Sequence, residues 1–172
     1  MGKEKQRKIG VIASQIIKHK GIFNFNAILD AIPDWLSQHN YDYVQKGHAQ
    51  KAKPSGGYFE GNWIAEKEVT EYVKFNISVD IWLRDLKDIA IEKNGKTEKS
   101  NKGNIEITFN SGMEKDYKKT FTNKKYQETE FLKLIREFYE KYVIKSKLSS
   151  YEEKIEAETQ DFIEYIKTFL HK

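Results

Sequence analysis

The residues that could carry acid and base chemistry are carboxylates near the end of one strongly patterned segment. They are Asp80, Asp85 and Asp88, with Arg84 among them, and Asp116 further along the chain. Paired carboxylates act as general acid and base only where burial or neighbouring charge separates their pKa values. Alternation puts Asp80 on the polar side of its segment, so a solvated charge is the simpler interpretation. We therefore predict no catalytic residue and expect that the protein is not an enzyme.

Metal and nucleophile chemistry finds little support in the sequence. Cysteine is absent, which excludes disulfides, thiolate metal sites and cysteine nucleophiles. The four histidines have no spacing that would put two of them on one face of a helix or strand: His19, His39, His48 and His171. No serine lies in a Gly-x-Ser-x-Gly elbow, and the glycines after Pro54 lack the Gly-Lys-Ser ending of a phosphate loop. The sequence predicts no metal site and no cofactor.

Aromatic residues interleaved with lysines are the pattern that core packing explains least. Trp82 falls on the polar side of its segment, together with Lys74 and Arg84. A tryptophan there is typical of a surface that stacks nucleic-acid bases, of an aromatic anchor at a protein interface, or of a ring that another segment covers. We rank cover or a protein interface above nucleic acid. The predicted interface consists of Trp82, Tyr72, Lys74, Arg84 and Trp63.

A basic N-terminal region is the second candidate surface. The net charge is +4, and residues 1–56 alone carry nine basic and four acidic side chains. Such a region could follow phosphates or an anionic membrane surface, although a solubilising tail is the simpler interpretation. Its candidate contact residues are Lys3, Lys5, Arg7, Lys8, Lys18 and Lys20.

The longest apolar stretch bears on the location of the protein. Ile9 to Ile17 is much shorter than the roughly 20 residues that a membrane helix needs. The stretch also lacks the small-residue cleavage site of a secretory signal. We therefore expect no transmembrane segment and a cytoplasmic location.

The elements that must position these residues follow from changes in hydrophobic period. Apolar residues alternate with polar ones from Val73 to Leu83, and again from Ile105 to Phe109, which predicts strands with one buried face. Asn94-Gly95 predicts a two-residue hairpin turn, because both of its positions favour positive φ. Further turns are predicted at Pro54 to Gly57 and at Asn101 to Gly103.

Helical spacing frames this strand region on both sides. A first helix is predicted after the N-cap Asn24, ending near Asn40, with Pro33 either kinking it or starting a second short helix. Ile9 to Ile17 could be a strand or a helical turn. Two C-terminal helices are predicted to cover the sheet, separated near 146–150; their apolar stripes are Phe131, Ile135, Phe138, Tyr139 and Tyr142, then Ile155, Phe162, Ile163, Ile166, Phe169 and Leu170.

The fold class that results is α+β. We expect an antiparallel meander of about five or six strands, preceded by one helix and covered by two long C-terminal helices. Residues 1–172 are expected to form a single domain, with a flexible basic terminus over 1–8.

Scattered residues over 22–172 resemble a group of small uncharacterised archaeal proteins. They are Trp63, Tyr72, Phe75, Gly103, Asp116-Tyr117, Phe138-Tyr139-x-x-Tyr142-x-Ile144-Lys145, Tyr151 and Ile166-Lys167-x-Phe169-Leu170. The resemblance implies an intracellular setting in an archaeon or an archaeal virus. It implies no activity, cofactor or catalytic residue.

Three functional hypotheses remain open from the sequence. The leading one is a non-enzymatic protein-binding or assembly module that uses the sheet face and the C-terminal helices. The second is a protein that binds a small lipid-like ligand, in which a curved sheet grips a helix around an apolar cavity. The third is a weakly basic nucleic-acid-binding protein that uses its N-terminal region. A protein partner or self-association is the expected mode of action.

Overall fold

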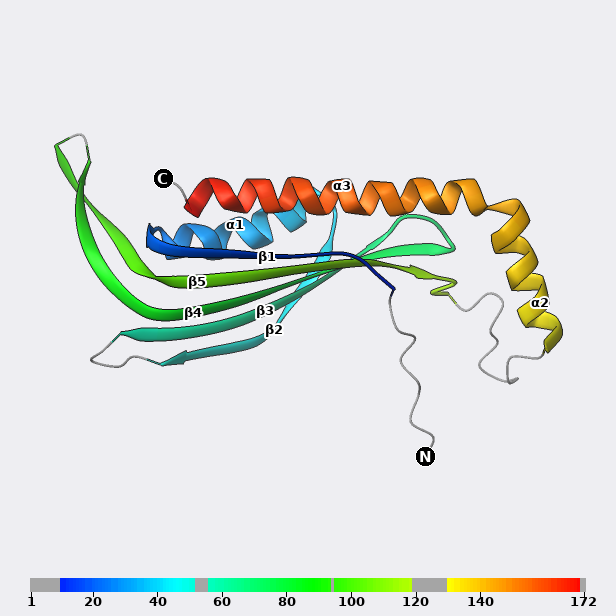
Figure 1. The fold of residues 1–172 in the computed structure, drawn as a ribbon, viewed down its shortest axis with the longest axis horizontal. Helices are drawn as coiled ribbons and strands as arrows, with labels where there is room; N and C mark the ends of the chain where they lie inside the picture. Colours follow the sequence, from blue (N-terminus) through cyan, green and yellow to red (C-terminus); the bar gives the residue numbers. More distant parts are fainter. Residues whose placement is uncertain (1–9, 52–55, 94, 119–129, 171–172) are drawn as a thin grey trace, which may run out of the picture.

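The computed structural model describes residues 10–51, 56–93, 95–118 and 130–170. Five strands form one antiparallel sheet in the order β1-β5-β4-β3-β2 (Figure 1). In chain order, the elements are β1 (Gly10–Phe23), α1 (Phe25–Gln38), β2 (Asp42–Lys51), β3 (Gly57–Glu68), β4 (Val73–Lys93), β5 (Lys96–Lys115), α2 (Glu130–Phe138), the π-helix η1 (Tyr139–Val143) and α3 (Lys145–Leu170). The predicted α+β class is confirmed.

The strand β1 resolves a segment whose structure the sequence left open. Ile9 to Ile17 could be a strand or a helical turn, and from Gly10 onward it belongs to a 14-residue strand. This strand pairs antiparallel with β5, the last strand in chain order, from Gly10 to Phe23. The consequence is that Lys18 and Lys20 lie in the sheet, beside β5 and close to β4, rather than in a separate tail.

The hairpin between β4 and β5 turns where the sequence predicts. Lys93 pairs with Lys96, and Gly95 has a φ of 75°, a conformation that glycine adopts without a steric penalty. Asn94 lies outside the described residues, as do Pro54 and Ser55 of the predicted turn at Pro54 to Gly57. The turn predicted at Asn101 to Gly103 is wrong, because these residues continue β5.

A bulge in β4 lets the pairing between β4 and β5 continue past Asn101 to Gly103. The register between the two strands shifts between Arg84 and Lys87, and Asp85 has a φ of 57°. Bulges bend a strand and increase its twist. Beyond this point the β4–β5 hairpin curves toward the helix side of the sheet (Figure 1). There the Ser100 hydroxyl donates a hydrogen bond to the carbonyl of Phe23.

The helix α1 begins as predicted and continues through its proline. The Asn24 side chain accepts a hydrogen bond from the amide of Ala27 at 3.0 Å, which caps the first turn. Pro33 lies inside one continuous helix, so no second short helix starts there. The chain leaves the helix through His39 and Asn40, and Asn40 has a left-handed φ of 59°. The predicted end near Asn40 is confirmed.

The core lies between one face of the sheet and the helices α1 and α3. Figure 1 shows α3 running along the sheet beside α1. The fully buried Phe162 of α3 stacks on Trp35 of α1, with 4.2 Å between ring centroids, and meets Phe109 of β5 edge to face at 5.3 Å. Stacked and edge-to-face rings are the geometries that the aromatic quadrupole favours. These rings therefore join the three elements.

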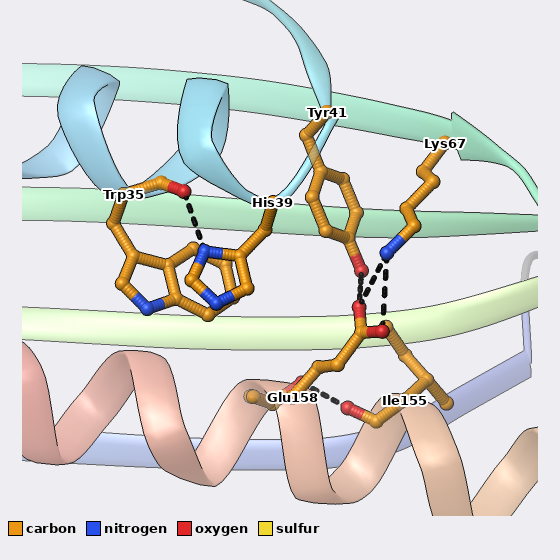
Figure 2. A network of polar contacts seen from close by, with 7 residues as sticks. Trp35, His39, Tyr41, Lys67, Ile155 and Glu158 are labelled. Carbon is orange, nitrogen blue, oxygen red and sulfur yellow. Dashed lines mark hydrogen bonds and ion pairs between the residues drawn. The ribbon is translucent and has the colours of Figure 1, made fainter.

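A half-buried polar network fixes the position of α3 above the sheet (Figure 2). Glu158 of α3 accepts a hydrogen bond from the Tyr41 hydroxyl at 2.7 Å and from the Lys67 ammonium at 3.1 Å. Burial first, and then the hydrogen bond and charge of Glu158, raise the pKa of Tyr41 far above its usual value. Because a buried carboxylate without partners is costly, this contact favours one placement of α3 along the sheet.

The C-terminal helices depart from the prediction in two ways. The break between them falls at Ile144, whose φ and ψ are −120° and 9°, rather than near 146–150. Cover of the sheet is correct for α3, which buries seven residues, and wrong for α2, which buries none. Figure 1 shows α2 beyond one end of the strands, pointing away from α3.

Candidate functional site

The face of the sheet that points away from α1 and α3, called the open face below, joins the two surfaces that the sequence treated separately. Lys18 of β1 pairs with Glu106 of β5, which pairs with Trp82 of β4. In the next row, Lys20, Asn104 and Arg84 are aligned in the same way. A hollow of about 540 Å³ lies among these side chains.

The chemistry of this hollow is cationic and aromatic. Lys18, Lys20 and Arg84 contribute positive charge, while the ammonium of Lys18 lies 3.0 Å from the carboxylate of Glu106. Both partners of that ion pair are well exposed, so water and salt weaken the attraction. Trp82 is 41% exposed and meets Tyr58 edge to face. The arrangement can hold an anionic group beside an aromatic ring.

Trp63 does not belong to the open face. Its side chain is 4% exposed and lies in the core, so the expected exposure of this residue is wrong. Gly61 allows this packing, since a Cβ atom built there would lie 2.8 Å from the Trp63 indole. The alternation of Trp63 with Ala65 was the signal that could have assigned it to the covered face.

Tyr72 and Lys74 lie at the start of β4, whereas Trp82 lies near the middle of that strand. Lys74 pairs with Glu66 and Glu114 at 3.0 and 3.3 Å. Burial alone would lower the pKa of Lys74, but its hydrogen bonds to these carboxylates raise it overall. The predicted interface residues thus do not form one surface.

Contacts of Tyr72 show what it does at its end of the sheet. Its hydroxyl donates a hydrogen bond to Glu140 of η1, and its ring meets Tyr139 edge to face at 5.5 Å. Burial and then Glu140 raise the pKa of Tyr72. The Lys115 ammonium lies 3.9 Å from the same carboxylate. Tyr72 therefore attaches η1, and with it α2, to the end of the sheet.

The basic residues at the start of the chain are only partly described. Lys18 and Lys20 lie on the open face of β1, as given above. Lys3, Lys5, Arg7 and Lys8 lie outside the described residues, as does the terminus expected over 1–8.

The leading hypothesis from the sequence includes the C-terminal helices, and the first of them exposes an apolar face on α2 and η1, called the α2 stripe below. Its side chains are between 37% and 69% exposed: Phe131, Leu134, Ile135, Phe138 and Tyr142. They line a shallow hollow of about 500 Å³ with Glu137 and Lys141 at its edge. The sequence showed this stripe but assigned it to the core, because an amphipathic period alone does not say what covers the apolar face.

The carboxylates first considered for catalysis do not form one cluster. Asp80, Asp85 and Asp88 accept hydrogen bonds from Asn62, Asn104 and Asn101 on neighbouring strands. Asp116 is buried at the end of β5, and its amide donates a hydrogen bond to the carbonyl of Tyr72. Within the described part of the chain, no group of three or more histidines and carboxylates is arranged to hold a metal ion.

Comparisons with known proteins add no assignment. No family model matches the chain, and a search of curated proteins finds no match. The resemblance to archaeal proteins therefore stays a prediction. Among the described residues, every helix is too short or too polar to cross a lipid bilayer.

Proposed function

We propose that this chain is a non-enzymatic protein-binding or assembly module whose principal interface is the α2 stripe. The observation that carries the proposal is an apolar stripe of five large exposed side chains, four on α2 and Tyr142 on η1, with no residue of either helix buried. With large side chains presenting about 200 Å² each, the stripe leaves on the order of 600 Å² of apolar surface in water. Monomers rarely expose a larger contiguous patch, and such patches mark interaction sites.

The attachment of α2 supports the same proposal. Tyr72, Tyr139 and Glu140 hold the η1 end of the helix against the sheet. The stripe is thus presented in a defined orientation at the end of the molecule (Figure 1). Because the helix is already held in place, it would lose little conformational freedom when a partner binds, which favours affinity. A cytoplasmic location is part of the proposal.

Site-specific photocrosslinking in cells tests the proposal directly. A photoreactive phenylalanine analogue replaces Phe138 in the stripe, and the matched control carries it at Gln160, which is exposed on α3. We expect a discrete protein adduct from position 138 and none from position 160. No protein adduct from position 138, or the same set from both positions, would contradict the proposal.

A second candidate function is supported by the open face. Lys18, Lys20 and Arg84 surround one hollow together with the exposed ring of Trp82. Cations that follow phosphates beside an aromatic ring that stacks a base are the features of single-strand nucleic-acid binding. Its affinity would fall steeply with salt and lose about one unit of the salt slope in Arg84→Gln. A salt-insensitive affinity would argue against this function.

The lipid-like ligand hypothesis has less support. The space between α3 and the sheet contains fully buried large side chains, among them Phe109, Phe162 and Ile166. Native mass spectrometry of the purified chain tests this alternative, because a bound lipid-like molecule would add its mass to the spectrum. We expect no such added mass.

A further inference from the structure

We propose that the partner of the α2 stripe is a second copy of this chain, packed with its own stripe antiparallel about a two-fold axis. The inference rests on the proposed function and names its partner. A two-fold interface uses the same patch on both copies, so the patch must be complementary to itself. The charges along the α2 stripe meet this condition.

The charges lie along one edge of the stripe. At 100° per residue along α2, Glu130 and Glu137 project from the same side of the apolar face, and Lys141 follows Glu137 by four residues, about one turn, in the wider π-helix η1. Both Glu137 and Lys141 border the hollow that the stripe forms. In an antiparallel pair, the same edges of the two helices meet, with opposite ends together. Glu130 of one copy would therefore lie beside Lys141 of the second copy, and this pairing would occur twice.

The opposite edge of α2 and η1 faces the body of the molecule. Leu132, Arg136 and Tyr139 project from this side and are half-buried, and Tyr139 contacts Tyr72 of the sheet. Among the residues that the structure describes, the edge that carries Glu130 and Lys141 is therefore the one open to a neighbour. A parallel arrangement would instead bring this edge against the opposite edge of the second helix, which faces the body of its own molecule, and that opposes the parallel orientation.

The size of the surface agrees with a dimer. Two stripes together would bury about 1,200 Å², at the lower end of specific interfaces, so we expect dissociation in the micromolar range. The position of α2 also permits the contact, because the helix lies beyond the ends of the strands (Figure 1) and its stripe residues are exposed.

The third charge on this edge gives a separate expectation. Glu137 lies near the middle of the stripe, where the two-fold axis would bring it close to Glu137 of the second copy. Like charges at this distance repel each other. The variant Glu137→Gln should therefore dimerise more tightly than the wild-type chain, whereas a contact with a different protein would not require this effect.

A charge-swap experiment on the full chain tests the inference by sedimentation velocity. We expect the wild-type chain to dimerise, and Glu130→Lys and Lys141→Glu alone to dimerise about tenfold more weakly. An equimolar mixture of the two variants should form heterodimers at nearly wild-type affinity, because both pairings become attractive again. Glu156→Lys, at an exposed site on α3, is the matched control and should leave the dimer unchanged.

The outcomes separate this inference from the proposed function. A monomeric wild-type chain would overturn the dimer, as would a dimer that neither charge reversal weakens or a mixture that does not recover. If position 138 still crosslinks to a different protein, the stripe remains an interface and only the second copy is wrong. All four substituted side chains are exposed, so circular dichroism should show unchanged folding.

Discussion

The helices α2 and α3 are both amphipathic and follow each other in the chain, but only α3 has its apolar stripe covered. The covered residues of α3 are Leu148, Ile155, Thr159, Phe162, Ile163, Ile166 and Leu170. The α2 stripe is of similar character and is bare. The comparison teaches that hydrophobic period identifies a face that needs cover, whereas the surrounding structure decides whether the same chain supplies it.

Length and placement explain the difference. The 26 residues of α3 extend over about 39 Å, close to the roughly 46 Å of the 14-residue strand β1. The helix α2 precedes α3 and lies past the end of those strands, where the sheet offers no further surface (Figure 1).

The largest effect that should sharpen this comparison is at Phe162. Replacement by Ala would leave a cavity between Trp35 and Phe109, and we expect the free energy of unfolding to fall by about 3–5 kcal/mol. Urea unfolding monitored by circular dichroism measures this change. A loss below about 1 kcal/mol would mean that α3 is not packed as described.

A smaller effect is expected at Glu158. The variant Glu158→Ala removes the shared partner of Tyr41 and Lys67, and should cost about 2 kcal/mol in the same assay. The exposed Glu156→Ala, two residues away and on the opposite side of α3, is the control and should change stability by less than about 0.5 kcal/mol. Equal effects of the two variants would contradict a specific role for the network.

Alkaline pH should weaken the same contact in a predictable direction. The folded state raises the pKa of Tyr41 above its ordinary value of 10.0, so it holds a proton that the unfolded chain releases. Stability from this group is therefore full below pH 10 and is lost as the pH rises above it, by about 1.4 kcal/mol per pH unit. Comparing the free energies of unfolding of wild type and Tyr41→Phe across this pH range measures the loss of stability, which the variant should not show.

The smallest effect is expected at Phe138, the counterpart of Phe162 in the bare stripe. Because its side chain is 61% exposed, Phe138→Ala should change the stability of the monomer by less than about 0.5 kcal/mol. The measurement requires dilute protein, so that no partner contributes. A loss of several kcal/mol would mean that the stripe is covered within the chain, and the comparison with α3 would fail.

Much of the fold could be predicted because its patterns are local. Alternation over Val73 to Leu83 identified the central strand, and the residues of the N-cap at Asn24 and the turn at Gly95 have conformational preferences of their own. Trp82 was recognised because it breaks that alternation, and the structure leaves it exposed.

The candidate site was less predictable because it depends on pairing between distant segments. Lys18 and Trp82 lie on the same face because β1 joins β5 at the edge of the sheet, a contact between residues far apart in the chain. The side of Trp63 could have been derived from parity, but its burial needed α1 and α3 as cover.

The sequence by itself determined the periods, and with them the element types, the α+β class and the two apolar stripes at the C-terminal end. Only the tertiary structure decided which stripe is buried, which cations meet Trp82, and where the chain ends one helix and starts the next. The physical reason is that side-chain direction follows from local backbone geometry, whereas burial depends on which distant surface lies opposite. For α3 that surface is the sheet, and for α2 we propose a second copy.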